Sequence, residues 1–352
     1  MDKEYIEQIK KIEAELEKWL PGIQDSGNAS ERTQKYESLL AEEKNVSPVS
    51  LQALIAPGKD ILSRGGKRWR PLLMTLICES LGGGDASLPL APLVEFSHNA
   101  TLIHDDIEDD SEERRGKPAI HKIYGIDTAI NSGSFLYFLS LTCLEAYNGK
   151  NKEQLYKLWA EYMRDLHLGQ AMDISWHKKL AFIPTIDEYF IMCGFKTGAL
   201  ARLSAEIGAY TAGASRETAL RLGDAAQKLG IGFQILDDVK NLTTGIPGKK
   251  RGDDVVEGKK SLPVLLFLTR YPEKRKKVYF CFHAAKINGT AVPEVAELIQ
   301  LLSESGVIKE AEEKARSIVE EARSVFASPE PTGSPINERD SNLLNGFINL
   351  IS

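Results

Sequence analysis

The sequence predicts an all-α protein, and three observations support this fold class. Apolar residues recur at the spacing of amphipathic helices through most of the chain. Strand-like alternation bounded by turn residues is hard to find. Glycine, proline and clustered basic residues interrupt the helical pattern at a small number of places. We therefore expect helices joined by short loops.

The composition is that of an ordinary globular protein. The chain has 352 residues, of which 42% are hydrophobic and 27% charged, enough to bury a large core. A formal charge of -6 gives no basic excess, so we expect no nucleic-acid partner. The 4 cysteines are far apart and resemble neither a disulfide framework nor a zinc site, which favours a reducing, cytoplasmic location. No apolar run is long enough for a transmembrane segment.

The first half of the chain begins with an amphipathic helix. Its apolar positions share one face, and Pro21 and Gly22 end it; they are Ile6, Ile9, Ile12, Leu16 and Leu20. Residues 23–47 are polar and indicate a loop with room for one exposed helix. Residues 51–147 indicate helices, which break at 64–66, 82–84 and 115–118.

The second half continues the helical pattern from about 152 to 237. Glycine and lysine crowd residues 243–260, which we expect to form a loop, and helices resume at Leu262. Residues 328–337 indicate a surface loop before a short last helix. No linker separates two cores, so we expect a single domain, 1–352. It comprises an N-terminal helix and polar extension (1–47), a motif-bearing core (48–265) and C-terminal helices (266–352).

Two acidic clusters lie inside apolar helical surroundings. The first is LIHDDIEDD, and the second is FQILDDVKN. Asp105 and Asp109 are one helical turn apart, about 5–6 Å. Their carboxylates repel by roughly 3 kcal/mol at an effective dielectric of about 20, and a divalent cation between them reverses that sign. Such a cluster alone is equally compatible with a solvated helix end. Apolar neighbours place both clusters against a core, where unpartnered carboxylates are costly, so we favour magnesium sites.

Basic residues accompany the acidic clusters. They include Lys67 and Arg70 behind two glycines, the Arg114–Gly116 segment, Lys196 in FKTG, and the lysines of the loop (Lys249, Lys250, Lys259 and Lys260). Each alone is more often a solvated surface group. Together with two metal-binding clusters they indicate a substrate that carries condensed phosphates. No Walker-type loop and no serine-hydrolase elbow is present.

Six motifs in this order resemble the trans-isoprenyl diphosphate synthase family. They are GGKRWRP, HDDIEDDSEERRGKP, GQAMD, FKTG, FQILDDVKN and GKKRGDDVVEGKKSLP, and they span about residues 48–265. The resemblance implies an isoprenoid synthase-type helical barrel around a deep central cavity, usually a homodimer. It also implies a magnesium-dependent prenyltransferase that joins isopentenyl diphosphate to an allylic diphosphate.

The resemblance also assigns roles to residues. Asp105, Asp109 and Asp237 would hold three magnesium ions, supported by Asp106 and Asp238. The allylic diphosphate would be held by Arg114, Lys196, Lys249 and Lys259. Isopentenyl diphosphate would be held by Lys67, Arg70, His98 and Arg115. Polar positions at the reacting ends would be Gln170, Asp173, Thr197 and Gln234; of the whole set, Lys196, Thr197 and Gln234 would act at the reacting atoms.

Two positions depart from the family pattern. Asn241 stands where many members carry Asp, which predicts weaker binding of the third ion. Ser134 stands where Asp is common, and the sequence offers no physical account of that change.

Small residues precede the first acidic cluster at Ser97, Ala100 and Thr101, which share one helix face. Farnesyl-length synthases commonly place aromatic residues there, so the resemblance implies a product of C20 or longer. Phe135 or Phe138 could then cap a deeper cavity. Small residues that simply permit close helix packing remain the alternative.

Three other functions stay open. A class I terpene cyclase also uses an aspartate-rich motif, but it needs no isopentenyl site, and GGKRWRP and RRG are present here. A non-catalytic subunit of a heteromeric synthase would be expected to have eroded aspartates, and these are intact. A purely structural helical protein would have no reason to combine metal and phosphate ligands.

Overall fold

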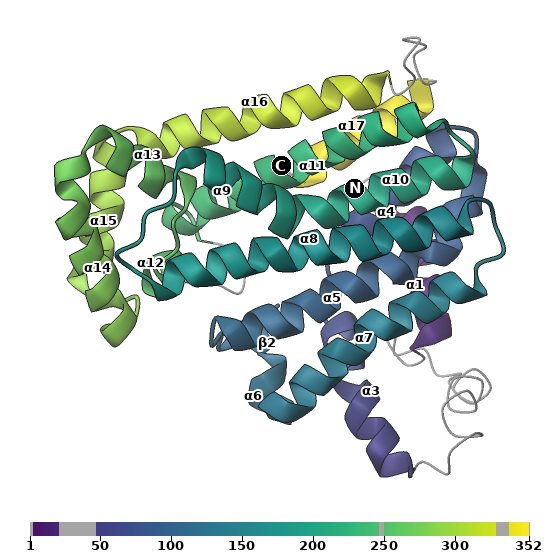
Figure 1. Cartoon of the computed structure of the whole chain (residues 1–352), viewed down its shortest axis with the longest axis horizontal. Coiled ribbons are helices and arrows are strands. Elements are labelled where there is room, and N and C mark those ends of the chain that lie inside the picture. Colours follow the sequence, from purple (N-terminus) through teal and green to yellow (C-terminus); the bar gives the residue numbers. More distant parts are fainter. Residues whose placement is uncertain (1–2, 21–46, 246–249, 329–337, 352) are drawn as a thin grey trace. The chain divides into compact units, whose positions relative to one another are not determined.

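The computed structural model describes residues 3–20, 47–245, 250–328 and 338–351. Over these residues it is helical apart from one two-stranded hairpin, which confirms the all-α prediction (Figure 1). By its internal contacts the chain divides into two compact units. Unit 1 comprises Met1–Leu158, Ser204–Ala219 and Ile336–Leu344. Unit 2 comprises Trp159–Leu203, Leu220–Pro335 and Asn345–Ser352. A single domain over the whole chain stays a prediction.

The elements before residue 158 belong to unit 1. In chain order they are α1 (Lys3–Trp19), α3 (Pro48–Ser63), α4 (Trp69–Ser80), the 3-10 helix η1 (Gly84–Leu90), α5 (Ala91–Glu108), β1 (Glu113–Arg114), β2 (Lys117–Pro118), α6 (Ile120–Tyr124) and α7 (Ile126–Ala146). The helix breaks predicted at 64–66 and 82–84 are confirmed. At 115–118 the break is the turn of an antiparallel hairpin that pairs Arg114 with Lys117.

Four helices contribute residues to both units: α8 (Lys152–Lys178), α10 (Ala199–Ala212), α11 (Arg216–Leu242) and α17 (Glu338–Ile351). The other elements of unit 2 are α9 (Ile186–Cys193), the π-helical turn η2 (Gly194–Gly198), α12 (Asp253–Glu257), α13 (Leu262–Arg270), the 3-10 turn η3 (Pro272–Lys274), α14 (Arg275–Asn288), α15 (Pro293–Glu304) and α16 (Val307–Ala327).

Three loop predictions can be compared with this element list. The loop expected over 243–260 contains the short helix α12, because Gly252 and Gly258 adopt φ of 86° and 77° and turn the chain into and out of it. The predicted loops at 23–47 and 328–337 fall almost wholly outside the described residues. The predicted last helix is α17.

Unit 1 packs its helices around apolar stripes and small residues. On the predicted apolar face of the N-terminal segment, Ile12, Leu16 and Leu20 are fully buried, whereas Ile6 near its start is 40% exposed. Helices α5 and α7 lie against each other, and the Ser97 hydroxyl donates to Ser140 Oγ at 3.2 Å. The small residue Ser97 therefore serves helix packing, the alternative left open above. Phe138 is 69% exposed, so the suggestion that it caps a cavity is wrong for the chain by itself.

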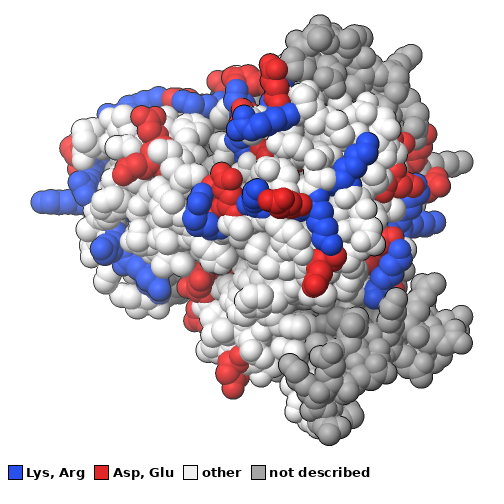
Figure 2. Space-filling view, turned by 45° about the vertical axis from the view of Figure 1, so that its right-hand side comes forward, with Lys and Arg blue, Asp and Glu red and all other residues white. Residues whose placement is uncertain are grey.

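Unit 2 is built around α11, α13 and α16. The buried face of α16 repeats every three or four residues at Ala311, Ala315, Val319, Ala322 and Phe326. Figure 1 shows α12, α13, α14 and α15 gathered at one end of this unit. On the face of the molecule shown in Figure 2, described Lys and Arg side chains are interspersed with Asp and Glu. No helix within the described ranges combines the length and apolarity needed to cross a bilayer.

Candidate active site

The first acidic cluster lies at the C-terminal end of α5. The Asp109 N–H donates to the Asp105 carbonyl at 2.9 Å, so the two residues are one turn apart, as predicted. Asp109 is the residue that ends the helix. Carboxylates at a helix C-terminus face the negative end of the helix dipole, which is unfavourable by about 0.3–1 kcal/mol each unless a cation is nearby. The cluster therefore favours binding of a cation.

Arg114 supplies one such cation. Its Nε donates to Asp106 Oδ1 at 2.9 Å, and its NH2 lies 3.5 Å from Asp105 Oδ2. Burial alone would lower the pKa of Arg114, but Asp106, Asp105 and Asp109 raise it above its ordinary value. Asp106 is fully buried, so it supports Arg114 beneath the surface, whereas the Asp105 side chain keeps 22% of its area exposed. Arg114 lies among the carboxylates in this structure.

The hairpin brings both arginines back to α5. Arg115 and Gly116 adopt φ of 55° and 73°, a left-handed conformation that costs energy for arginine. Arg64 holds the hairpin from α3, because its NH1 donates to the carbonyls of Arg114 at 3.1 Å and Pro118 at 2.9 Å. Asp60 fixes the Arg64 guanidinium in turn, with contacts of 2.9 and 3.0 Å. The Asp60–Arg64 ion pair, with its two hydrogen bonds, therefore fixes the guanidinium that holds the strained turn.

A second cationic group surrounds the loop between α3 and α4. Arg68 is 3% exposed and has a left-handed φ of 47°. Its guanidinium donates to Glu13 of α1 at 2.7 Å, to Glu95 of α5 at 2.9 Å and to the Leu62 carbonyl at 2.7 Å. Arg68 thereby links α1, α5 and the loop, and it forms ion pairs with both Glu13 and Glu95.

Arg70 and Arg115 share this cluster but have no carboxylate hydrogen-bonded to them among the described residues. Arg70 is 7% exposed, and its Nε is buried without a hydrogen-bond partner. Its NH1 lies 3.3 Å from His98 Nε2. Burial lowers the pKa of Arg70 and of Arg115 to about 10 each, although Glu95 opposes this shift. Burial and the neighbouring Arg70 hold the pKa of His98 well below its ordinary value, so His98 is neutral.

Arg70 is buried, while Arg115 and His98 are half-buried, and together they form a site whose positive charge no hydrogen-bonded carboxylate of the described residues compensates. Lys67, the fourth residue predicted here, lies exposed in the same loop. An anion is the ligand that such a site favours.

In unit 2, Lys196 lies in the π-helical turn η2, the FKTG motif. Its Nζ contacts Asp173 Oδ2 of α8 at 2.6 Å. Burial alone would raise the pKa of Asp173, but Lys196, His177 and Lys259 bring it well below its ordinary value. A π-turn inside a helix often marks a functional site, because it aims side chains differently from the regular helix.

Glycines let α8 and α11 approach this turn. A Cβ atom on Gly169 would lie 2.4 Å from the Lys196 backbone nitrogen, and one on Gly230 would lie 2.8 Å from the Gly198 Cα. Both distances are shorter than side-chain contacts allow. The glycine of GQAMD is thus required for the position of Lys196, which the sequence alone did not show.

A chain of hydrogen bonds runs from η2 to the second acidic cluster. The Thr197 hydroxyl donates to Gln234 Oε1 at 2.8 Å, and Gln234 Nε2 donates to Asp238 Oδ1 at 2.9 Å. The Tyr189 hydroxyl donates to Asp238 Oδ2 at 2.7 Å. Burial, followed by the nearby Asp254, raises the pKa of Asp238 to about 7. Asp238 is therefore a supporting residue, while Asp237 beside it is half-exposed.

Asn241 is fully buried and has a structural contact. Its Oδ1 accepts a hydrogen bond from the Asp254 N–H at 3.2 Å, and its carbonyl accepts one from the Gly252 N–H at 3.0 Å. Asn241 thus tethers α12 to the end of α11. Lys259 lies near the same helix, with its Nζ 2.7 Å from Glu257 and 3.4 Å from Asp254.

Lys260 corrects one inference from the sequence. It was grouped with the lysines that face a diphosphate, but it is 3% exposed. Its Nζ donates to the Gly258 carbonyl at 2.6 Å and the Trp176 carbonyl at 3.4 Å, and it lies 4.7 Å from the centre of the Phe282 ring. Burial lowers the pKa of Lys260 to about 8. Lys260 joins α8 to the α12–α13 loop and is a packing residue.

The structure brings most predicted site residues into groups within each unit. Unit 1 groups Asp105, Asp106, Asp109 and Arg114, and also Arg70, His98 and Arg115. Unit 2 groups Asp173 with Lys196, and Thr197 with Gln234 and Asp238. Gln170 is half-buried one turn before Asp173. Lys249 lies outside the described residues.

The residues that support these groups directly, or through Arg68 and Asn241, include four that were not predicted from the sequence: Glu13, Glu95, Tyr189 and Asp254. An acidic residue inside an apolar helix was a usable signal for Glu95. The other three had none, because their partners lie far away in sequence.

The donor set suits a hard cation such as magnesium. Asp105, Asp109 and Asp237 offer partly exposed carboxylate oxygens, which such ions prefer. Among the described residues, no group of three or more His, Cys, Asp and Glu side chains is already arranged around one point. A site of few protein ligands, completed by water and substrate phosphate, is the usual form for magnesium.

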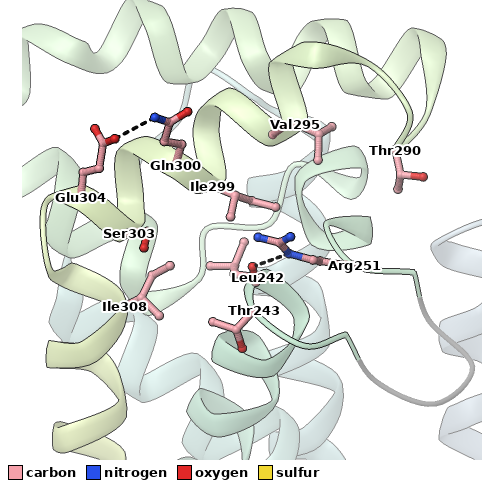
Figure 3. Close-up of a pocket in the computed structure, with 11 residues that line it drawn as sticks. Leu242, Thr243, Arg251, Thr290, Val295, Ile299, Gln300, Ser303, Glu304 and Ile308 are labelled. Atoms are coloured by element: carbon pink, nitrogen blue, oxygen red, sulfur yellow. Dashed lines mark hydrogen bonds between the residues drawn. The ribbon is translucent and has the colours of Figure 1, made fainter.

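A separate pocket of about 490 Å³ lies in unit 2, between the end of α11 and α15 (Figure 3). Its walls include Leu242, Thr243, Ile299 and Ile308, and the Arg251 Nε donates to the Leu242 carbonyl at 3.0 Å. None of the predicted site residues lines it.

Comparisons with known proteins agree with the motifs. The family model described as polyprenyl synthetase matches residues 51–301. A short chain isoprenyl diphosphate synthase of Methanocaldococcus jannaschii is 39% identical over 224 residues, 62% of this chain and 67% of that protein. A geranylfarnesyl diphosphate synthase of Aeropyrum pernix is 32% identical over 277 residues, 76% of this chain and 85% of that protein.

The fold also has close counterparts among solved structures. A geranylgeranyl pyrophosphate synthetase from Pyrococcus horikoshii OT3 matches with a TM-score of 0.80 and 27% identity, over 99% of this chain and 96% of that chain. The match confirms the isoprenoid synthase-type helical fold that the motifs implied. By its sequence motifs, the family model and its relatives, this chain belongs to the polyprenyl synthetase family.

Proposed function

We propose that this chain is an all-trans isoprenyl diphosphate synthase, a prenyltransferase that extends an allylic diphosphate with isopentenyl diphosphate to a product of C20 or longer. Its family acts on these two substrates with a divalent metal ion. The geranylfarnesyl and geranylgeranyl names of its relatives support the product length. One observation carries the proposal: the buried Arg70, whose Nε has no hydrogen-bond partner in the described part of the chain, lies with the half-buried Arg115 beside neutral His98 and forms an anion site that a terpene cyclase does not need.

The roles can be assigned unit by unit. In unit 1, Arg70, Arg115 and Lys67 would hold the diphosphate of isopentenyl diphosphate, with His98 accepting a hydrogen bond from Arg70 and so orienting its guanidinium. Asp105 and Asp109 would hold magnesium. In unit 2, Asp237 would hold a further ion, and Lys196, fixed by Asp173, would hold the allylic diphosphate. Lys249 and Lys259 would add positive charge to it.

The remaining polar residues would position the reacting ends. The buried Asp106 would orient Arg114, and the buried Asp238 would orient Gln234 and Tyr189, through the hydrogen bonds that they accept. Thr197 and Gln234, joined by a hydrogen bond, and Gln170 would present oxygens towards the developing allylic cation.

The chemistry follows from these assignments. Bound magnesium would supply positive charge to the departing diphosphate. The allylic C–O bond would break, and its electron pair would leave with the diphosphate, which Lys196 would stabilise. The double bond of isopentenyl diphosphate then forms a C–C bond to the allylic carbon. A proton is lost to the released diphosphate, so no protein base is required. The chain's own contribution is to position both substrates and exclude water.

The direct test is incubation with isopentenyl diphosphate and allylic primers, with and without magnesium, followed by chromatography of the products. Growth by isoprene units that retain the diphosphate is expected. Cyclised hydrocarbons would indicate the terpene cyclase, and a folded protein without turnover would indicate the non-catalytic subunit. Asp105→Ala should abolish turnover and leave the helix content unchanged, because it removes a repelling carboxylate. Full activity of that variant, or full activity of the wild type in excess chelator, would contradict the assignment of Asp105 as a magnesium ligand.

We also propose a cytoplasmic homodimer. The cytoplasmic location is supported by the 4 cysteines, which are all free and buried. The dimer is supported by α7, where Ile126, Ile130 and Phe138 are 57%, 45% and 69% exposed. Light scattering of the wild type should give a dimer mass, and Phe138→Glu should shift it towards the monomer. A monomeric wild type would contradict the proposal.

A further inference from the structure

Helix α14 of unit 2 contains no acidic residue. Its sequence, RKKVYFCFHAAKIN, includes three cations in its first turn and a fourth at Lys286. Val278, Cys281, Phe282 and Ala285 form its buried face. Figure 1 shows α14 beside α15 at the end of this unit. The helix is therefore a cationic element on a chain whose formal charge is -6.

The opposite face of α14 combines cations with large apolar groups. Its exposed side chains fall within an arc of about 120° at 3.6 residues per turn. We define the α14 surface as Lys276, Tyr279, Phe280, His283, Lys286 and Ile287, which are all exposed. Tyr279, Phe280 and Ile287 are 43%, 53% and 66% exposed. Three large apolar side chains exposed on one helix face indicate a surface that contacts an apolar partner.

The three cations in the first turn of α14 are not explained by helix stability, whereas Lys286 in the last turn is favoured by the helix dipole. Positive charge in the first turn opposes the helix dipole and costs up to about 1 kcal/mol per residue. Arg275 donates to the Ala181 carbonyl, and Lys277 pairs with Glu297 of α15. Among the described residues, none forms a salt bridge with Lys276 or Lys286. Lys276 therefore opposes the helix dipole without a salt bridge from the described residues to compensate it, which favours an anionic partner outside the chain.

The C-terminal end of α8 and the segment after it add further exposed cations and an exposed aromatic ring. Lys178 and Lys179 are exposed, and Phe182 is 43% exposed. A groove of about 380 Å³ separates this segment from α14, and its walls include Leu180, Ile183 and Phe282. Arg275 anchors the segment through the Ala181 carbonyl. The nearest acidic residue in sequence, Glu273, precedes the helix.

We propose that the α14 surface, with Lys178, Lys179 and Phe182, binds the face of a bilayer that contains anionic phospholipids. Lysine stems can lie along an apolar layer while their ammonium groups meet lipid phosphates. Tyrosine and phenylalanine insert at the boundary between headgroups and acyl chains. A nucleic acid would match the charge but would leave Phe280 and Ile287 in water. The inference does not depend on the residue roles proposed above, since none of these residues has one.

The test is sedimentation of the full chain with vesicles of phosphatidylcholine, with or without phosphatidylglycerol. One variant removes charge, Lys276→Gln with Lys286→Gln. A second removes apolar area, Phe280→Ser with Ile287→Ser. The matched control is Lys309→Gln with Arg316→Gln on α16, whose side chains are 82% and 71% exposed. Prenyl transfer between soluble substrates serves as the folding control, because none of the variants touches the proposed site.

The wild type should bind only the anionic vesicles, and more weakly at high salt. Each lysine removed should weaken partitioning roughly fivefold, so the charge variant, which lacks two, should lose about twenty-fivefold. The apolar variant should lose at least about tenfold, because it removes two large apolar side chains, and the control should bind as the wild type does. The proposal is overturned if the wild type does not sediment with anionic vesicles, or if the control loses as much as the charge variant. It is also overturned if the apolar variant binds normally while single-stranded DNA competes equally with vesicles, which would identify a polyanion site.

Discussion

Glu95→Gln tests whether Glu95 compensates the positive charge of Arg68, Arg70 and Arg115 in unit 1. Glu95 is 2% exposed and accepts hydrogen bonds from Arg68 and from Asn99 Nδ2, each at 2.9 Å. It also raises the pKa of Arg70 and Arg115, so its charge acts on three guanidinium groups. Glutamine keeps the shape and loses the charge. Loss of one partner of a buried ion pair costs about 3–5 kcal/mol, and we expect about 3 kcal/mol here because Glu13 still pairs with Arg68.

Glu13→Gln is the matched control. Glu13 contacts the same guanidinium at 2.7 Å, but its side chain is 16% exposed, and the pKa of Arg70 is set by burial, Glu95 and Arg115. Its loss should cost about 1 kcal/mol. Urea unfolding of both variants measures the difference.

Inorganic diphosphate then tests whether the cluster is an anion site. With chelator present to exclude metal binding, diphosphate at about 100 times its dissociation constant stabilises a protein by about 2.7 kcal/mol. Glu95→Gln should gain more from diphosphate than the wild type does, because the ligand replaces the missing negative charge. Equal costs for the two variants, with equal gains from diphosphate, would refute the reasoning.

Four further results are expected. Arg70→Ala should raise the Michaelis constant for isopentenyl diphosphate at least about tenfold and hardly change that for the primer, with partial recovery in Arg70→Lys; equal changes would reassign the residue. Asn241→Asp should lower the urea midpoint, because it adds a buried charge beside Asp254, and should leave the magnesium titration unchanged; a lower magnesium requirement would instead make it a metal ligand. Ala100→Phe should shift products towards C15 on chromatography, unless the fully buried Ala100 only serves helix packing. Finally, the folded state releases the Lys260 proton more readily than the unfolded state, so the free energy of unfolding should rise relative to Lys260→Met as pH increases from about 8 towards 10.5; a flat difference would mean that Lys260 is not desolvated.

The sequence determined the helices and the motifs, because both depend on short-range patterns. Helical periodicity located α1 and the breaks at 64–66 and 82–84. The i, i+4 spacing was sufficient to predict that Asp105 and Asp109 lie one turn apart. The six motifs, by their order and spacing, led to the family that the comparisons confirm.

The tertiary structure decided which of the charged residues stay accessible and which are buried in packing contacts. Lys259 and Lys260 are neighbours in a lysine-rich loop, yet Lys260 is buried against Phe282 because α14 packs over it. Asn241 matches a metal-ligand position in sequence, but its oxygen accepts the Asp254 N–H. The partners of Arg68 come from residues 13, 62 and 95. Such contacts depend on how distant segments pack together, and the periodicity of one segment carries no information about the side chains that another segment brings to it.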